Sequence, residues 1–365
     1  MRIGIDVRMW SESGIGRYIR NLIKNIVTTD AHQYVLFGLS KDWDEISSTI
    51  GKGNIRFVAA DFGWYSFEEQ IHLPILLYRE NLDLAHFPHF NIPIFYFKPF
   101  VVTIHDLTHF SFDMQRASTL PFFLYKIKQL AYQATFSQAI VRSKQIITVS
   151  NYVKDQIIKK FKVDATRISV IYEAADDLAM SSETSFNIEP KQYFFYVGNA
   201  HPHKNIEFLL RAFAIFRKQH SEYSLVLAGK QNYFWKQVMQ YAAEQNLSEQ
   251  VIFKGYVSDS ELKSLYSGAT AFVFPSLSEG FGLPVLEAML HRCPVLSSSA
   301  TCLPEIAGNA ALYFDPKLES SLVAGMERLT GDVEFRDALI TQGMEQVAKY
   351  NWKSMASLTL NVYNR

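Results

Sequence analysis

The sequence predicts an α/β protein with two parallel β-sheets, each covered by helices. Short apolar runs alternate with longer stretches of helical spacing, which is the pattern of α/β architecture. Many runs are continuously apolar, as in residues 100–104, and such runs are typical of strands buried on both faces of a parallel sheet. Thirteen candidate strands are present, which is too many for one compact open sheet.

The candidate strands fall into two groups on either side of a polar segment. The strands of the first group are residues 2–7, 34–39, 54–60, 84–87, 100–105, 145–150 and 168–172. The strands of the second group are residues 193–198, 224–229, 251–254, 270–275, 294–298 and 311–314. Residues 176–185 are polar and lack strong periodicity, so we place the domain boundary within 173–190.

The composition excludes several classes of protein. Hydrophobic residues make up 48% of the 365 residues and charged residues 20%, which excludes a disordered chain. Because 36 Lys and Arg balance 36 Asp and Glu, a dedicated nucleic-acid binder is excluded. No apolar run reaches the roughly 18 residues of a membrane span, and residues 1–7 resemble a strand rather than a signal peptide. Cys293 and Cys302 are too few for a disulfide framework or a zinc site, so a reducing cytoplasm is the expected location.

The most informative candidate site follows strand 270–275. Pro284 suits the first position of a helix, so the loop before it can offer backbone N–H groups to an anion. Glu279 and Glu287 place a carboxylate on either side, and carboxylates accept hydrogen bonds from hydroxyls. A phosphate flanked by hydroxyls describes a nucleotide sugar; the alternative is two solvated acids that the helix dipole favours. The loop consists of Gly280, Phe281, Gly282 and Leu283.

Two further candidate sites follow strands of the second group. Lys204 lies at the start of a helix, where the macrodipole disfavours a cation unless an anion joins it. The alternative is a solvated surface lysine. After strand 251–254, Ser258 is a plausible N-cap, and the backbone near Val257 either borders a nucleotide base or is purely structural.

The first group of strands offers two candidates. Gly14 and Gly16 precede a helix and allow a ligand close to backbone N–H groups, although an ordinary turn is the alternative. A dinucleotide fingerprint would need a third glycine where Ile19 stands, which disfavours NAD. His105 ends a buried strand and either hydrogen-bonds a substrate or is a core histidine satisfied by Asp106. The residues that end the preceding strand and can line the same crevice are His86, Pro88, His89 and Asn91.

Two segments have competing interpretations. Residues 42–44 match an Asp-X-Asp metal pattern, but an exposed turn with capping acids is the favoured interpretation. Residues 122–125 with Lys126 and Lys128 form either a basic-aromatic patch that contacts the inner face of a membrane or a helix packed in the core.

The pattern Glu279-X7-Glu287 around residues 280–284 resembles the signature of the family 4 retaining glycosyltransferases. The resemblance covers nearly the whole chain in order and spacing. It extends to residues 103–106, 148–150, 196–198, 204–205 and 303–308. It implies the GT-B fold, with two Rossmann-like domains facing across a cleft. It also implies a first domain at 1–175, joined by a C-terminal helix at 352–365 that crosses back to it, and a nucleotide-sugar domain at 186–351.

The resemblance also implies roles for the candidate residues. Glu287 would hold the ribose hydroxyls, Glu279 the donor sugar, and Lys204 the diphosphate. The backbone of 280–283 would contact sugar and phosphate. His105 would lie beside the reacting sugar, which makes His105, Lys204 and Glu279 the catalytic candidates. The remaining donor-binding candidates are Gly14, Gly16, Asn199 and Val257.

Four positions depart from the pattern of many relatives. Asn199 replaces an Arg, His203 replaces another Arg, and Glu173 with Ala174 replaces an Asn-Gly pair. These changes resemble the mannosyltransferase-like branch that acts in surface polysaccharide assembly. With fewer fixed cations, more of the phosphate charge rests on Lys204 and helix dipoles.

The predicted function is therefore a retaining, metal-independent glycosyltransferase. It would move a hexose, with mannose the leading candidate, from GDP-mannose or a UDP-sugar to a glycan or lipid-linked acceptor. No cofactor is implied besides the donor. The alternatives are a nucleotide-sugar 2-epimerase, a phosphorylase, and a non-catalytic nucleotide-sugar-binding protein. The presence of His105, Lys204, Glu279 and Glu287 argues against the last.

Overall fold

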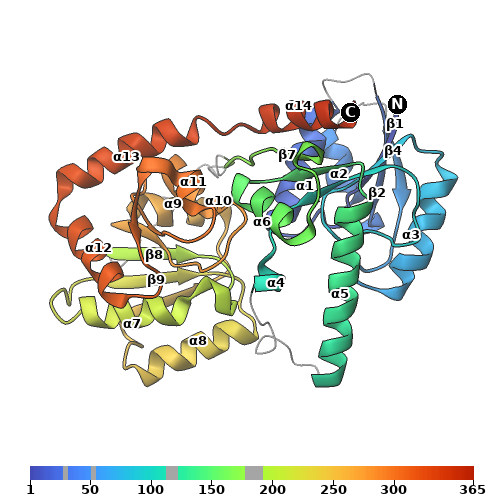
Figure 1. Cartoon of the computed structure of the whole chain (residues 1–365). Helices are drawn as coiled ribbons and strands as arrows, with labels where there is room; N and C mark the ends of the chain where they lie inside the picture. Colours follow the sequence, from blue (N-terminus) through green and yellow to red (C-terminus); the bar gives the residue numbers. More distant parts are fainter. Residues whose placement is uncertain (28–31, 51–54, 112–121, 177–191) are drawn as a thin grey trace. The chain divides into compact units, whose positions relative to one another are not determined.

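The computed structural model describes residues 1–27, 32–50, 55–111, 122–176 and 192–365 (Figure 1). By their internal contacts these residues form two compact units. The first unit holds Met1–Leu107, the chain from helix α5 (Phe122–Arg142) to Glu173, and Asn351–Arg365. The second unit holds the described part of Ala174–Tyr350 and the short helix α4 (Thr108–Ser111).

The first unit is built on a seven-stranded parallel sheet in the order β3-β2-β1-β4-β5-β6-β7. Its strands are β1 (Arg2–Asp6), β2 (Gln33–Gly38), β3 (Ile55–Ala59), β4 (Leu84–Phe87), β5 (Phe100–Ile104), β6 (Gln145–Thr148) and β7 (Ile168–Val170). Its other helices are α1 (Gly14–Ile26), α2 (Trp43–Ile50), α3 (Phe67–Arg79), α6 (Asn151–Phe161) and α14 (Trp352–Tyr363).

The second unit is built on a six-stranded parallel sheet in the order β10-β9-β8-β11-β12-β13. Its strands are β8 (Tyr193–Val197), β9 (Ser224–Ala228), β10 (Val251–Gly255), β11 (Ala271–Phe274), β12 (Val295–Ser298) and β13 (Ala311–Phe314). Its helices are α7 (Ile206–Phe216), α8 (Tyr233–Glu244), α9 (Asp259–Gly268), α10 (Leu283–Leu290), α11 (Leu303–Ala307), α12 (Glu319–Gly331) and α13 (Val333–Val347).

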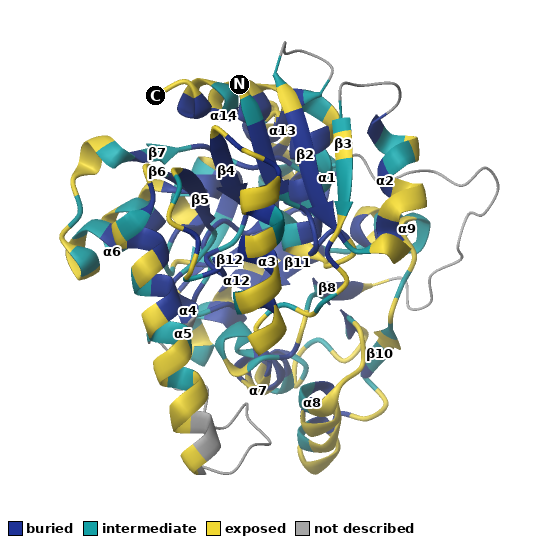
Figure 2. Cartoon of the chain, turned by 90° about the vertical axis from the view of Figure 1, so that its right-hand side faces the viewer, coloured by how far each residue is buried: buried dark blue, intermediate teal, exposed yellow. Residues whose placement is uncertain are grey.

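The apolar runs of the sequence form the centre of each sheet. Strands β4, β5, β11 and β12 are buried along their whole length, as continuous apolar runs predict for a sheet covered on both faces. Figure 2 shows β2, β4 and β5 of the first sheet mostly in dark blue, the edge strand β3 mostly in teal, and much of α3 and α5 in the yellow of exposed residues. All thirteen predicted strands are present, so the prediction of two parallel sheets is confirmed.

The C-terminal segment rejoins the first unit. Asn351 caps α14, which packs against α1 and whose Tyr363 hydroxyl lies 2.6 Å from Nδ1 of the buried His86 on β4. The first unit differs from the predicted 1–175 domain in losing α4, which groups with the second unit. Much of the predicted boundary segment 173–190 lies outside the described residues.

Candidate active site

The strand order of the second sheet reverses between β8 and β11. In doubly wound sheets the ligand crevice lies beyond the carboxyl ends of the strands at this switch point. The segment with Gly198, Asn199 and Lys204 follows β8, and the loop with Glu279 follows β11. The topology therefore brings two separately predicted segments to the same edge.

Lys204 and Glu279 form an ion pair at this edge. The ammonium Nζ of Lys204 lies 2.5 Å from Oε1 of Glu279, and the two side chains are only 14% and 13% exposed. The same Nζ lies 5.6 Å from the ring centroid of Phe274 at the end of β11. Lys204 is thus not the solvated surface lysine of the alternative interpretation. The anion that joins it in this structure is the carboxylate of Glu279.

The loop between Glu279 and α10 is fixed by contacts with residues 301–303. The backbone N–H of Glu279 donates to Oγ1 of Thr301 at 3.2 Å. The thiol of Cys302 donates to the carbonyls of Glu279 and Phe281 at 3.4 and 3.3 Å. Gly282 has a φ of +99°, and a Cβ there would lie 2.8 Å from Cδ2 of Leu303. Only glycine fits this conformation without strain, so the loop has one defined shape.

Glu287 lies one turn into α10 and is buried. Its Oε2 accepts a hydrogen bond of 3.0 Å from the hydroxyl of Tyr266 on α9. The alternative of a solvated helix-end acid is therefore wrong for Glu287. A buried carboxylate is stable only where hydrogen-bond donors meet it, so this position is suited to hydroxyl groups. Pro284 is the second residue of α10, one position later than predicted.

The turn after β8 depends on close backbone approach. A Cβ on Gly229, which follows β9, would lie 2.0 Å from the carbonyl oxygen of Gly198. The hydroxyl of Tyr196 donates to the carbonyl of Asn199 at 2.7 Å.

Asn205 adopts the left-handed conformation with a φ of +60°, and its amide donates to the carbonyls of Pro275 and Pro316 at 3.2 and 2.9 Å. Asn205 thereby ties the Lys204 turn to the loop after β11, a role that the sequence analysis missed.

Ser258 caps α9, as predicted. Its side chain and that of Glu261 form a capping box with the backbone of the first turn. Val257 is half-buried just before this cap. The capping role of the segment is confirmed, and contact of Val257 with a base stays a prediction.

His105 follows β5 in the first unit and has two partners. Its Nδ1 lies 3.0 Å from Oε1 of Glu173, and its Nε2 lies 2.9 Å from the carbonyl oxygen of Pro88. Burial alone would lower the pKa of His105, but the hydrogen bond and charge of Glu173 and the Pro88 carbonyl raise it above the usual value. The hydrogen-bond partners are thus Glu173 and Pro88 rather than Asp106, whose charge contributes at longer range.

The two glycines near the start of α1 have different surroundings. A Cβ on Gly16 would lie 2.4 Å from the carbonyl of Trp10 and 2.9 Å from that of Met9, so the close approach of the chain to itself requires glycine. A Cβ on Gly14, the first residue of α1, would meet nothing within 4 Å. The packing explains Gly16 without a ligand, and a ligand role for either glycine stays a prediction.

Two family models match the chain, one to each half. The model of the glycosyl transferases group 1 matches residues 153–346, which is more than half of the chain, and that of glycosyltransferase family 4 matches residues 13–177. The chain belongs to the group 1 glycosyltransferases. The resemblance in the sequence motifs is therefore confirmed, and the protein is a transferase rather than a binding protein without activity.

Curated relatives and solved structures agree with this family. The glycosyltransferase is 28% identical to O-antigen chain mannosyltransferase B of Escherichia coli over 96% of both chains. It is 30% identical to O-antigen chain mannosyltransferase RfbU of Salmonella typhimurium over 82% of this chain and 78% of the relative. Sucrose-phosphate synthase from Thermosynechococcus elongatus has a TM-score of 0.78 at 17% identity, over 100% of this chain and 98% of that chain. The GT-B fold class is confirmed.

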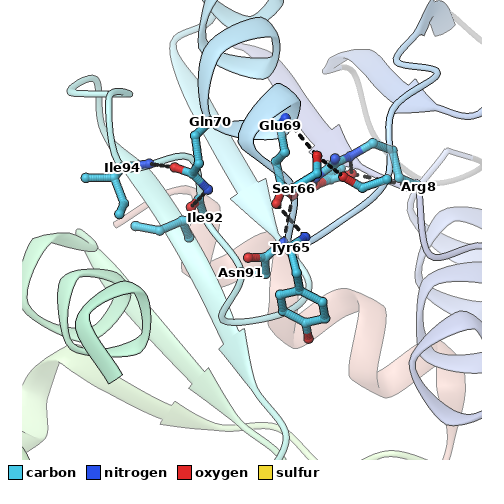
Figure 3. A network of polar contacts seen from close by, with 10 residues as sticks. Arg8, Tyr65, Ser66, Glu69, Gln70, Asn91, Ile92 and Ile94 are labelled. Carbon is cyan, nitrogen blue, oxygen red and sulfur yellow. Dashed lines mark hydrogen bonds and ion pairs between the residues drawn. The ribbon is translucent and has the colours of Figure 1, made fainter. Parts of the chain in front are cut away.

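The glycosyltransferase holds a buried ionic network that the sequence analysis did not single out (Figure 3). Nε and Nη2 of Arg8 donate to the carboxylate of Asp6 at 2.9 and 2.7 Å, and Nη2 also pairs with the fully buried Glu69. Asn91 and the backbone N–H of Tyr65 donate to the same carboxylate of Glu69 at 2.7 and 2.8 Å.

The network joins the end of β1 to the residues after β4, where the strand order of the first sheet reverses. Asp6, Arg8 and Asn91 line a small pocket there, with Met9, Ile19, Phe87, Pro88 and His89.

The favoured interpretation of the Asp-X-Asp segment is partly wrong. Asp42 is buried and accepts a hydrogen bond of 2.6 Å from the hydroxyl of Ser11, so it does not lie on an exposed turn. Asp44 lies in the first turn of α2, where an acid is favoured by the helix dipole. Within the described ranges, no group of three or more His, Cys, Asp or Glu residues is placed to hold a metal ion.

The segment at the start of α5 is exposed in part. Phe123 is 72% exposed, and Ile127 and Leu130 further along the helix are also exposed. The alternative of a helix packed in the core is therefore wrong for these three residues, and contact with a membrane stays a prediction. In the part of the chain that the structure describes, no helix is long and apolar enough to cross a membrane.

Proposed function

We propose that this glycosyltransferase moves mannose from a nucleotide-diphosphate sugar to the growing chain of a surface polysaccharide. Two relatives that match most of the chain carry the name O-antigen chain mannosyltransferase. The observation that carries the proposal is the Lys204–Glu279 pair, with the buried Glu287 on helix α10 that follows the loop of Glu279. Lys204 and Glu279 follow β8 and β11, the strands at the switch point of the second sheet, where such folds bind nucleotides.

The three side chains divide the donor between them in this proposal. Lys204 takes the diphosphate, because its ammonium is the cation at the carboxyl edge of β8 and β11. Glu279 then exchanges the ammonium for a hydroxyl of the donor sugar. Glu287 accepts hydrogen bonds from the ribose hydroxyls, as it does from Tyr266. The acceptor, a glycan or a lipid-linked glycan, lies with the first unit in this proposal.

In this proposal the transfer proceeds with retention, as the resemblance to the family 4 retaining glycosyltransferases implies. The bond between the anomeric carbon and the phosphate oxygen breaks, and the bond to the acceptor oxygen forms on the same face. The proton of the acceptor hydroxyl passes to the departing phosphate oxygen. Negative charge grows on the diphosphate as its bond breaks, so Lys204 stabilises the transition state more than the bound donor. Lys204 and helix N-termini supply the positive charge, and we expect activity to survive an excess of chelator.

Ligand-induced thermal stabilisation followed by turnover measurement tests this proposal. A donor at 100 times its Kd should stabilise the fold by about 2.7 kcal/mol, which identifies the binder among GDP-mannose, UDP-sugars and ADP-sugars. With that donor, Lys204→Ala should lower turnover by about 10²-fold or more, and the apparent donor affinity less. The matched control is Lys236→Ala, because Lys236 is exposed on α8.

Three results would contradict the proposal. If no nucleotide sugar stabilises the protein, the donor site is misplaced. If Lys204→Ala and Lys236→Ala have equal turnover, Lys204 does not hold the diphosphate. Release of free nucleotide at the same rate with and without acceptor would favour an epimerase instead.

A further inference from the structure

His105 presents both ring nitrogens to hydrogen-bond acceptors. A proline carbonyl can only accept a hydrogen bond, so the contact of 2.9 Å between Nε2 and the Pro88 oxygen requires a proton on Nε2. Nδ1 lies 3.0 Å from Oε1 of Glu173, and its role depends on the charge of that carboxyl group. It donates to an ionised carboxylate or accepts from a protonated one.

The surroundings of the His105 ring favour the arrangement in which Nδ1 donates to the ionised carboxylate. Glu173, after β7, and Asp106, after β5, are the negative groups that act on His105, and both favour the charged imidazolium. His86 on β4 does not compete as a cation, since burial and then the charge of His105 lower the pKa of His86 to about 3. Tyr18 on α1 meets the ring edge-on at 5.0 Å between centroids, and burial raises the pKa of Tyr18, so it stays neutral.

We infer that Glu173 holds His105 doubly protonated and fixed in place, and that Glu173 is thereby a positioning residue for the transfer reaction. The catalytic part of this inference rests on the proposed function. With both N–H groups committed to Glu173 and Pro88, His105 has no lone pair left to act as a general base. It acts as a fixed positive charge. Its two hydrogen bonds join the segments after β4, β5 and β7.

The burial of Glu173 supports a specific function for its carboxylate. Glu173 is buried, and a buried carboxylate is costly unless a cation or several donors meet it. His105 is the cation that meets it here.

Nuclear magnetic resonance of the histidine ring nitrogens tests the protonation directly. Protein labelled with ¹⁵N-histidine is titrated without any substrate, and the His105 resonances are assigned by their loss in His105→Gln. In the wild type both ring nitrogens should stay protonated at pH values where an ordinary histidine is neutral. In Glu173→Gln the pKa of His105 should fall by about one unit or more, because a neighbouring opposite charge shifts a pKa by about 1–3 units.

Two further variants make the result specific. Glu173→Asp keeps the charge and should retain a raised pKa, which covers the case that Glu173→Gln fails to fold. Glu45→Gln, at an exposed position in the first turn of α2, should leave the His105 titration unchanged. If His105 of the wild type titrates as an ordinary histidine, or if Glu173→Gln leaves its titration unchanged, the inference is overturned.

The pH dependence of turnover tests the positioning role. A histidine with a raised pKa keeps its charge at low pH and loses it as the pH rises through that pKa. Turnover should therefore fall on the alkaline side, and this fall should move about one pH unit or more lower in Glu173→Gln. An alkaline limb at the same pH in both enzymes would refute a positioning role. Because the titration needs no substrate, a raised pKa in a protein without transferase activity would contradict the proposed function alone.

Discussion

Two ion pairs of this protein join side chains that lie far apart in the sequence. Lys204 and Glu279 are 75 positions apart, and Arg8 and Glu69 are 61 positions apart. Lys204 and Glu279 were predictable separately, because each follows a strand, but their contact was not predictable. Arg8 was missed because it resembles any charged residue after a strand, and its burial depends on Glu69 and Asn91 from other segments.

The proposed contact of Glu287 with the donor can be tested by substitution. If it accepts hydrogen bonds from ribose hydroxyls, Glu287→Ala loses charge-assisted bonds worth about 1.5–3 kcal/mol each. The affinity for the donor should fall at least tenfold in titration calorimetry, while the circular dichroism spectrum is kept. The control is Glu334→Ala, at an exposed position in the first turn of α13. Equal donor affinity in the two variants would exclude Glu287 from the donor site.

Arg8 provides a second test, this time of stability. Arg8→Met removes the cation between two carboxylates and leaves them buried without it, which should cost about 3–5 kcal/mol of unfolding free energy. The exposed pair of Arg211 and Glu319 is the matched control, because Arg211→Met should cost at most about 1 kcal/mol. Urea denaturation measures both values. Equal losses would mean that the Arg8 network adds nothing beyond a surface ion pair.

Secondary-structure elements follow from local sequence more directly than the side-chain contacts do. The strands were predictable because their apolar runs are long enough to indicate burial on both faces, as in β5 and β11. The start of α10 was predicted one residue too late, because Gly282 rather than a polar cap ends the loop. A glycine's left-handed φ is visible only in the folded chain.

The left-handed conformation of Gly282 before α10 can also be tested by substitution. Gly282→Ala forces a side chain into a left-handed conformation and towards Leu303, so it should destabilise the fold by about 1–3 kcal/mol and weaken donor binding. Gly14→Ala is the matched control for stability. Its Cβ has open space in α1, so the substitution should be neutral or stabilise the fold by up to about 1 kcal/mol. Thermal unfolding of both variants measures the difference, and equal midpoints would contradict a strained loop.

Each sheet has its own switch point and its own cluster of polar side chains. The second sheet has Lys204 and Glu279 beyond β8 and β11, and the first has Asp6 and Arg8 at the end of β1 and Asn91 beyond β4. The presence of two sheets, and the strands that belong to each, were predictable from the sequence, because the number of continuous apolar runs exceeds what one sheet holds. The strand order, and with it the location of the two clusters, was not predictable from periodicity.

The anomeric configuration of the product decides whether this protein is a retaining glycosyltransferase. The enzyme is incubated with the nucleotide sugar that stabilises it and with a lipid-linked glycan acceptor, and the new glycosidic bond is examined by proton NMR. We predict a glycoside that forms only when acceptor is present and that keeps the anomeric configuration of the donor. An inverted product, or consumption of the donor without any new glycoside, would contradict the account.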